Sequence, residues 1–354
     1  MNLERVEKIA KAVLYEGYML YPYRPSAVKN RQRWNFGVLY PRGYSEAQAG
    51  SDAWMMQTEC LVEGGQRSRL EGKVRFLQLV ERSVGRVTFP GRQLRPGELP
   101  DFEIVEKLEL AGKVFYPWQE AVEREIILPM RHLASLSPEP LLEPFTLPSE
   151  KQFELLGGGS GPVAGIMVRE RGEIQGTVQI SAERVSHEVF RIGVRIQNES
   201  PVEVSESSSR EEALLRSLVS THTIMGIADG AFVSAVDPPE TLREIAAGCR
   251  SLGTWPVLVG EAGQRDTMLS SPIILYDYPQ VAAESAGDLF DGTEIDEILL
   301  LRIMTLTDEE KREMRQSDER ARELLERTEA LPVEHLMKLH GVVRGLRPLK
   351  EDTP

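Results

Sequence analysis

The chain has 354 residues, a composition ordinary for a globular protein and a formal net charge of −13 at pH 7. This length suffices for a buried core and favours two domains, because single cores rarely grow beyond about 250–300 residues. The negative charge argues against nonspecific nucleic-acid binding by the whole molecule. Two cysteines, the lack of a signal-peptide pattern and the lack of an uncharged apolar run of about 18 residues predict a soluble, cytoplasmic protein without structural disulfides or a membrane span.

The charge is distributed unevenly along the chain. Residues 1–50 carry eight basic and four acidic side chains, whereas residues 281–330 carry seven basic and fifteen acidic ones. Opposite charges at the two ends predict either that these regions dock on each other or that each faces a different partner.

Apolar residues at helical spacing predict an amphipathic helix over residues 3–19, followed by a basic and aromatic segment, residues 21–44. Arginine beside tyrosine and tryptophan is typical of binding surfaces. Three interpretations stay open: a nucleic-acid patch, internal docking on acidic C-terminal helices, or contact with another protein. We favour protein contact over nucleic acid, and the candidate binding residues are Tyr21, Tyr23, Arg24, Arg31, Arg33, Trp34 and Arg42.

Alternating patterns predict strands at residues 56–62, 74–80 and 102–110, with a turn at Gly64-Gly65. Residues 119–128 have the composition of a short helix that ends at Pro129, and residues 134–149 resemble a connection or linker. Further strands are predicted at 163–168, 174–180 and 189–198. Residues 20–200 therefore favour an antiparallel sandwich or curled sheet.

The polar stretch 201–209 is the predicted boundary between a domain of residues 1–205 and a mixed α/β domain of residues 206–354. Ser208 and Glu211 have capping-box spacing and predict a helix over 209–225. Strands are expected at 231–236, 255–259 and 272–276, and a helix from about 240 to Gly248. C-terminal helices are expected from about 293 and, capped by Thr307 and Glu310, over 308–330. The predicted fold class is α+β.

Motifs for cofactors and metals are incomplete. Residues 159–164 fit G-x-G-x-x-A, but a strand pattern follows them and Pro162 interrupts them, so we expect a turn and no nucleotide cofactor. The five histidines are scattered and no C-x-x-C occurs, so no metal site is predicted. An acidic cluster that includes Asp288, Asp291 and Glu294 suits helix capping on a solvated face, or weak binding of a cation or a partner.

His222 is the histidine most open to a chemical role, because it falls on the apolar face of the predicted 209–225 helix. It is either a core histidine with satisfied hydrogen bonds or a catalytic or ligand-binding one. If it does chemistry, its candidate companions are Cys249, Asp266 and Asp277. Cys249 is predicted to follow a helix C-terminus, where the helix dipole disfavours the reactive thiolate.

Two long runs resemble one uncharacterised protein family. The run AVLYEGYMLYPYRPSAVKNRQRWNFGVLYPRGYSEAQAGSDAWMMQTECLVEG, residues 12–64, is similar to its N-terminal signature. The run SSPIILYDYPQVAAESAGDLFDGTEIDEILLLRIMTLTDEE, residues 270–310, is similar to its second signature. That family is encoded beside [NiFe]-hydrogenase genes of the high-affinity, actinobacterial type. The resemblance implies an accessory, maturation or structural partner of a hydrogenase, and it brings no catalytic residues.

Three hypotheses follow. The first is a cofactor-free accessory protein that binds a hydrogenase subunit or a maturation protein through its charged ends. The second is a small-molecule enzyme, hydrolase-like, with a pocket between the two domains around His222, Tyr276 and Asp277. The third is a role in nickel or iron insertion. Oligomeric state does not follow from the sequence.

Overall fold

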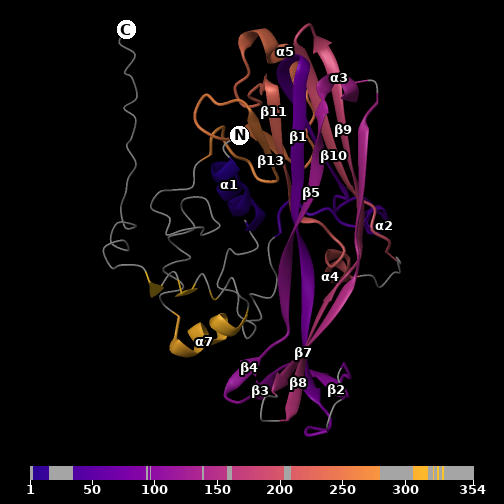
Figure 1. Cartoon of the computed structure of the whole chain (residues 1–354), viewed down its shortest axis with the longest axis vertical. Helices are drawn as coiled ribbons and strands as arrows, with labels where there is room; N and C mark the ends of the chain where they lie inside the picture. Colours follow the sequence, from indigo (N-terminus) through magenta and orange to yellow (C-terminus); the bar gives the residue numbers. More distant parts are fainter. Residues whose placement is uncertain are drawn as a thin grey trace.

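The computed structural model describes residues 3–15, 35–92, 95, 97–137, 139–157, 162–202, 209–279 and 306–317, together with residues 322, 325–326 and 329–330. Its strands form an eleven-stranded antiparallel sheet and a small two-stranded one, so the chain is mostly antiparallel β, as expected for the N-terminal part. In Figure 1 the strands lie along an elongated body, with one group of strands at the upper end and another at the lower end.

Strand β1 (Met55–Val87) runs through most of this length and holds the sheet together (Figure 1). It has 33 residues, or roughly 100 Å of contour at about 3.3 Å per residue. On one edge it pairs in turn with β10 (Val189–Asn198), β5 (Trp118–His132) and β2 (Phe102–Val105). On the other edge it pairs with β11 (Val219–Phe232) and β8 (Val163–Arg171).

Residues of β1 that are paired with two strands at once show which strands lie on opposite edges of β1. Val62 is paired with Phe190 of β10 and with Phe232 of β11, so these two strands flank β1 on opposite sides. Glu81 is likewise paired with Gln119 of β5 and with Glu170 of β8. Both edges of β1 are therefore occupied over much of its length, and each segment of the strand finds different partners.

The upper end of the molecule is built of two layers. Residues 55–63 of β1 continue a layer with β10, β9 (Ile174–Ser186) and β6 (Leu141–Leu147). Residues 69–77 lie between β5 and β11, and β11 continues to β13 (Thr267–Ser271) and β12 (Trp255–Leu258). The rings of Phe76 and Phe145 meet between the layers, 6.1 Å apart at their centroids.

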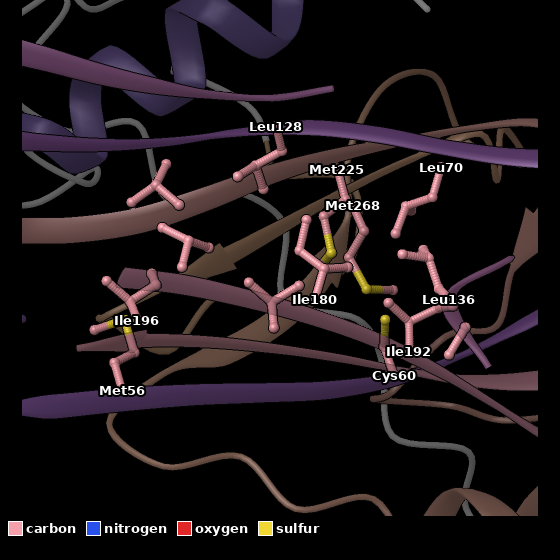
Figure 2. Close-up of a cluster of buried hydrophobic side chains, with 14 of the residues drawn as sticks. Met56, Cys60, Leu70, Leu128, Leu136, Ile180, Ile192, Ile196, Met225 and Met268 are labelled. Atoms are coloured by element: carbon pink, nitrogen blue, oxygen red, sulfur yellow. The ribbon is translucent and has the colours of Figure 1, made fainter. Parts of the chain in front are cut away.

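The upper core fills the space between these layers. Figure 2 shows Leu70, Leu128 and Met225 facing Ile192 and Ile196, with Met and Cys sulfur atoms among the aliphatic side chains. The short helix α3 (Leu133–Leu136), which follows β5, contributes buried leucines to this core. Helix α1 (Leu3–Tyr15) lies on the outer surface of β11, where its apolar stripe packs against Ile224 and Leu269.

The lower end contains a second sheet region, which we call the lower sheet: β7 (Glu150–Gly157), β8, residues 81–87 of β1, and β2. One of its faces is covered by the hairpin of β3 (Leu108–Leu110) and β4 (Lys113–Phe115). Leu108 of that hairpin packs with Val84, Leu156 and Met167 in the lower core. The upper and lower cores are formed by separate sets of residues.

A charged ladder, which we call the belt, lies across four strands between the two cores. Arg82 of β1 donates to Glu120 of β5 at 2.9 Å, and Arg169 of β8 donates to the same carboxylate at 2.8 Å. Arg169 also donates to Glu154 of β7 at 2.7 Å. Arg82 is almost fully buried, so its charge depends on these partners rather than on water.

Two local predictions for the first half are wrong. Gly64-Gly65 lies inside β1, because the runs on either side pair with different strands instead of with each other, and the extra residues form a register shift. Residues 119–128 are strand β5 rather than a helix. Their helix-forming residues are overridden by continuous pairing with β1 from Leu70 to Arg82. The predicted connection 134–149 contains α3 and β6.

In the second half, the predicted helix over 209–225 is also wrong. This range instead contains the short helix α4 (Arg210–Leu214), which has a capping box at Ser209 and Glu212, and the start of strand β11. Strand β12 and the helical stretch from Glu240 to Ala247 occur as predicted, whereas the strand expected at 272–276 lies earlier, as β13. Helix α7 (Asp308–Ser317) begins after Thr307 as expected, and the helix expected from residue 293 begins outside the described residues.

The sheet continues across the predicted domain boundary. Strand β11 follows residue 205, yet it pairs with β1 from Val62 to Leu77 and contributes Met225 and Phe232 to the upper core. Within the described residues, the two predicted parts therefore share one sheet and one core, because β1 needs a partner on each edge.

The belt gives a stability prediction. We expect Glu120→Gln to lower the free energy of unfolding by about 2–3 kcal/mol, because the buried Arg82 guanidinium loses its charged acceptor while the side-chain volume is kept. Glu109→Gln, in the exposed pair with Lys107, is the matched control and should leave stability unchanged. Urea unfolding measures both, and equal stability of the two variants would show that the belt contributes nothing.

Candidate functional site

The predicted binding residues fall mostly outside the described part of the chain. This holds for Tyr21, Tyr23, Arg24, Arg31, Arg33, Trp34, Asp288, Asp291 and Glu294. Arg42 is described and half exposed at the start of α2 (Arg42–Ala47). Its guanidinium donates to Glu46 at 2.7 Å and lies 4.7 Å from the centroid of the Trp54 ring. Partner binding by Arg42 stays a prediction.

The described end of the basic and aromatic segment packs against α4. Tyr40 and Tyr44 are buried in a cluster with Ala213. Arg210 lies over the Tyr40 ring, 5.4 Å from its centroid, and forms an ion pair with Asp52 at 3.1 Å. Burial raises the pKa of Tyr40 to about 12, so the phenol stays protonated at neutral pH. These two tyrosines therefore anchor the segment to this chain.

His222 lies in strand β11, opposite Arg75 of β1, and is 0% exposed. Helix α1 covers this part of the sheet, and its Glu7 forms ion pairs with Arg75 and Lys73. Desolvation by burial lowers the pKa of His222 to about 4, so the ring is neutral at neutral pH. The alternative enzyme hypothesis required His222 in an open pocket, and the structure encloses it instead.

The hydrogen bonds of His222 fix its tautomer. Nδ1 lies 2.8 Å from the backbone oxygen of Ser220, and a carbonyl oxygen can only accept, so Nδ1 carries the proton. Nε2 is then a bare lone pair, and it makes no hydrogen bond in the part of the chain that the structure describes. Ser220 has a φ of +54° at a β-bulge, which turns its carbonyl toward the ring.

The three proposed companions of His222 do not assemble around it. Asp277 accepts hydrogen bonds from Ser234 and from the backbone of Leu258 at 2.8 Å, and Asp266 accepts one from Thr267. Cys249 lies near Glu59 of β1, because the backbone N–H of the following residue, Arg250, donates to the Glu59 carboxylate. His222 is opposite Arg75, which lies 16 positions after Glu59 in β1. This separation corresponds to roughly 50 Å of strand contour. Burial raises the pKa of the Cys249 thiol, which disfavours the thiolate.

A charged cleft of about 930 Å³ lies beside α4, near the belt. It is lined by the turn Arg171–Glu173, by the end of β8 and by α4, with Tyr44 at one side. Its acidic side chains outnumber its basic ones: Glu81, Glu170, Glu173 and Glu212 against Arg171 and Arg216. Arg171 forms an ion pair with Glu150, and Arg216 donates to a backbone oxygen at 3.0 Å, so both cations are engaged within the chain.

The lower sheet has one apolar face that no described element covers, which we call the open face. Residues opposite each other in neighbouring strands point to the same face. One such row crosses all four strands: Ile104, Gly85, Ile166 and Leu155. Ile166 is fully buried at the centre of this row, whereas Ile104 and Leu155 at its two ends are 60% and 40% exposed.

Neighbouring rows extend the open face. Phe153 is opposite Val168, and Phe102 is opposite Val87. Gly85 is needed at the centre, because a Cβ there would lie 2.5 Å from the Phe102 ring and 2.7 Å from Ile166. Phe102 therefore lies across β1 against Ile166. Phe89, just beyond β1, is 65% exposed at the same end of the molecule.

The open face is the candidate functional site. Its centre is buried, and the large apolar side chains exposed at its two ends, Ile104, Phe153 and Leu155, are of the kind that takes part in interaction surfaces. Sequence reasoning placed Ile104 and Ile166 in predicted strands but did not identify this surface, because β7 lies in a stretch without a predicted element. The alternation of Phe153 and Leu155 with Gln152 and Glu154 was the available signal.

Among the described residues, no group of three or more His, Cys, Asp or Glu side chains is arranged to hold a metal ion. No helix in that part of the chain is both long and apolar enough to cross a membrane. Comparison of the chain with protein-family models and with curated proteins finds no match.

His222 gives a pH-dependent prediction. Its pKa of about 4 in the folded chain lies below the ordinary value of 6.5, so protons bind the unfolded chain more tightly. Its contribution to stability is complete above about pH 6.5 and declines as the pH falls toward about 4. Relative to His222→Asn, wild type should lose about 2–3 kcal/mol between about pH 7 and about 4.5.

Asparagine is the matched replacement, because its amide can still donate to the Ser220 oxygen and does not titrate. Urea unfolding at both pH values gives the difference between the two proteins. Parallel pH dependences would contradict the buried, neutral state of His222.

Proposed function

We propose that the protein is a non-catalytic accessory partner of a [NiFe]-hydrogenase system and acts by binding another protein. Two features support this proposal. The open face of the lower sheet supplies a contact surface, and the runs 12–64 and 270–310 resemble a family encoded beside hydrogenase genes. The partner class is a hydrogenase subunit or a maturation protein.

The open face is the observation that carries the proposal. Its exposed members come from β2 and from β7, on either side of a buried centre formed by Ile166 and Val168. An apolar patch with a buried centre and exposed ends offers the kind of surface on which hot-spot side chains pack. It lies at the end of the molecule opposite the upper core, as Figure 1 shows.

The surroundings of the open face favour a protein over a small molecule. Small-molecule sites are concave and enclose most of the ligand. A hollow at this end, lined by Val87, Phe89 and Val163 among others, holds about 10 Å³, roughly one water. The charged cleft beside α4 and the charged ends of the chain supply further polar contacts for a protein partner.

A native pull-down tests the proposal. We expect the tagged wild-type chain, isolated from the organism that encodes it, to retain a hydrogenase subunit or a maturation protein in stoichiometric amount. Ile104→Asp places a charge on the open face and should reduce the recovered partner by about tenfold or more. Mass spectrometry of the eluate gives the partner and its amount.

Leu142→Asp on β6 is the matched control, because Leu142 is 59% exposed but lies in the upper layer. It should retain the partner, and thermal unfolding should show both variants folded. Retention of the partner by Ile104→Asp would exclude the open face. Absence of any hydrogenase-related protein from the wild-type eluate would exclude the partner class.

A further inference from the structure

Strand β7 is an edge strand, and its free edge adjoins the open face. Among the described strands it pairs with β8 alone. Its register is continuous from Glu150 to Leu156, and most of its residues are exposed. One row of its backbone N–H and C=O groups therefore has no strand partner in the described part of the chain, which is the arrangement that accepts an added strand.

Most other free edges in the described sheet are short or interrupted by proline. The edge strands β5, β6 and β12 contain Pro129, Pro144 and Pro256, and proline removes a hydrogen-bond donor from a strand. Strand β2 has only four residues. Strand β7 has eight residues and no proline. Strand β5 is also proline-free before Pro129, but of these two long edges only that of β7 adjoins the open face.

We propose that the β7 edge binds an extended segment of a partner protein in which apolar and basic residues alternate. The proposal rests on the protein-binding function proposed above and specifies the chemistry of the partner. The two faces of β7 set this chemistry. Phe153 and Leu155 point to the open face together with Lys151, which pairs with Glu170, whereas Glu150, Gln152 and Glu154 point to the belt side, where Leu156 is buried in the lower core.

Cross-strand neighbours of an added strand would match this division. Apolar side chains would extend the open face beside Phe153 and Leu155. On the other face, lysine or arginine would lie beside the carboxylates of Glu150 and Glu154, which are 38% and 54% exposed. Glu150 is paired with Arg171 and accepts a hydrogen bond from Gln152, and Glu154 is paired with Arg169, so both carboxylates are engaged within the chain but remain partly exposed.

A second copy of the chain fits this edge poorly. In an antiparallel pair of two β7 strands, opposite residues share a face. One set of registers would place Glu150, Gln152 and Glu154 against the same residues of the partner copy, and like charges repel. The other set would place Phe153 and Leu155 on the same face as the copy's carboxylates. A basic, alternating segment avoids both conflicts.

A designed peptide tests the proposal on the full chain. The probe is a fluorescein-labelled peptide of about nine residues with alternating lysine and valine, and fluorescence anisotropy reports its binding. Peptides with alternating glutamate and valine, and with the lysines and valines in two blocks, are the sequence controls. We expect only the alternating lysine peptide to bind wild type.

The second part of the test reverses the charge of side chains along the β7 edge. The double variant Gln152→Lys with Glu154→Lys should bind the alternating lysine peptide about tenfold more weakly than wild type does. It should also bind the alternating glutamate peptide, which wild type does not bind. Gln48→Lys with Glu188→Lys changes the net charge equally at exposed positions away from β7 and should have no effect. Residue-level hydrogen exchange should show slower exchange at alternate amides of β7 when the peptide binds, because only alternate N–H groups face the free edge.

Binding without protection of β7 amides would overturn strand addition, as would equal weakening by both double variants. Concentration-dependent dimerisation that the β7 variant alters would assign the edge to a second copy and also overturn it. The two proposals fail separately. If the peptide does not bind but Ile104→Asp still loses the native partner, strand addition fails and the function stands. If the peptide protects β7 but Ile104→Asp retains the partner, the open-face contact fails.

Discussion

The antiparallel pairing of β1 on both edges is the interaction on which the rest of the structure depends. A strand of 33 residues cannot stand alone, because every unpaired backbone group that is buried costs free energy. Five other strands satisfy it in succession, and these strands come from both halves of the sequence. The order of the chain in space is therefore set by which segment of β1 each strand pairs with.

Because β1 is long, the upper and lower cores lie apart along it, with the belt between them and the open face at the lower end. The upper core is closed by facing layers, whereas among the described elements the lower sheet has the hairpin of β3 and β4 on one face. The belt of Arg82, Glu120 and Arg169 replaces apolar packing where neither core reaches. Because the lower sheet is held by β1 and by its own small core, its other face does not need to be covered for the fold to form.

Period-two alternation identified β10 and the adjacent strands, because each has one face in the core. Helix α1 and the capping box of Thr307 with Glu310 were also predictable, since both depend on neighbours within a turn of helix. The strand β5 was not, because its Glu, Gln and Ala residues favour a helix until β1 supplies a partner for each of them. His222 was assigned to a helix for a different reason, the capping-box spacing ahead of it and the spacing of its apolar neighbours. Its neighbours on both sides are buried, which looks alike in a helix and in a strand covered on two faces. The open face was only partly readable from the sequence, because an exposed Ile104 and a buried Ile166 both look like inward-facing strand residues and differ in their place at the end or the middle of the sheet.

The central claim is that the open face is the surface that contacts another protein in the cell. Site-specific photo-crosslinking measures this directly, with the photoreactive residue p-benzoylphenylalanine placed at Ile104 or, for comparison, at Leu142. The account predicts a covalent adduct with a hydrogenase subunit or a maturation protein from position 104 and none from position 142. No adduct at 104, or equal adducts at both positions, would contradict it.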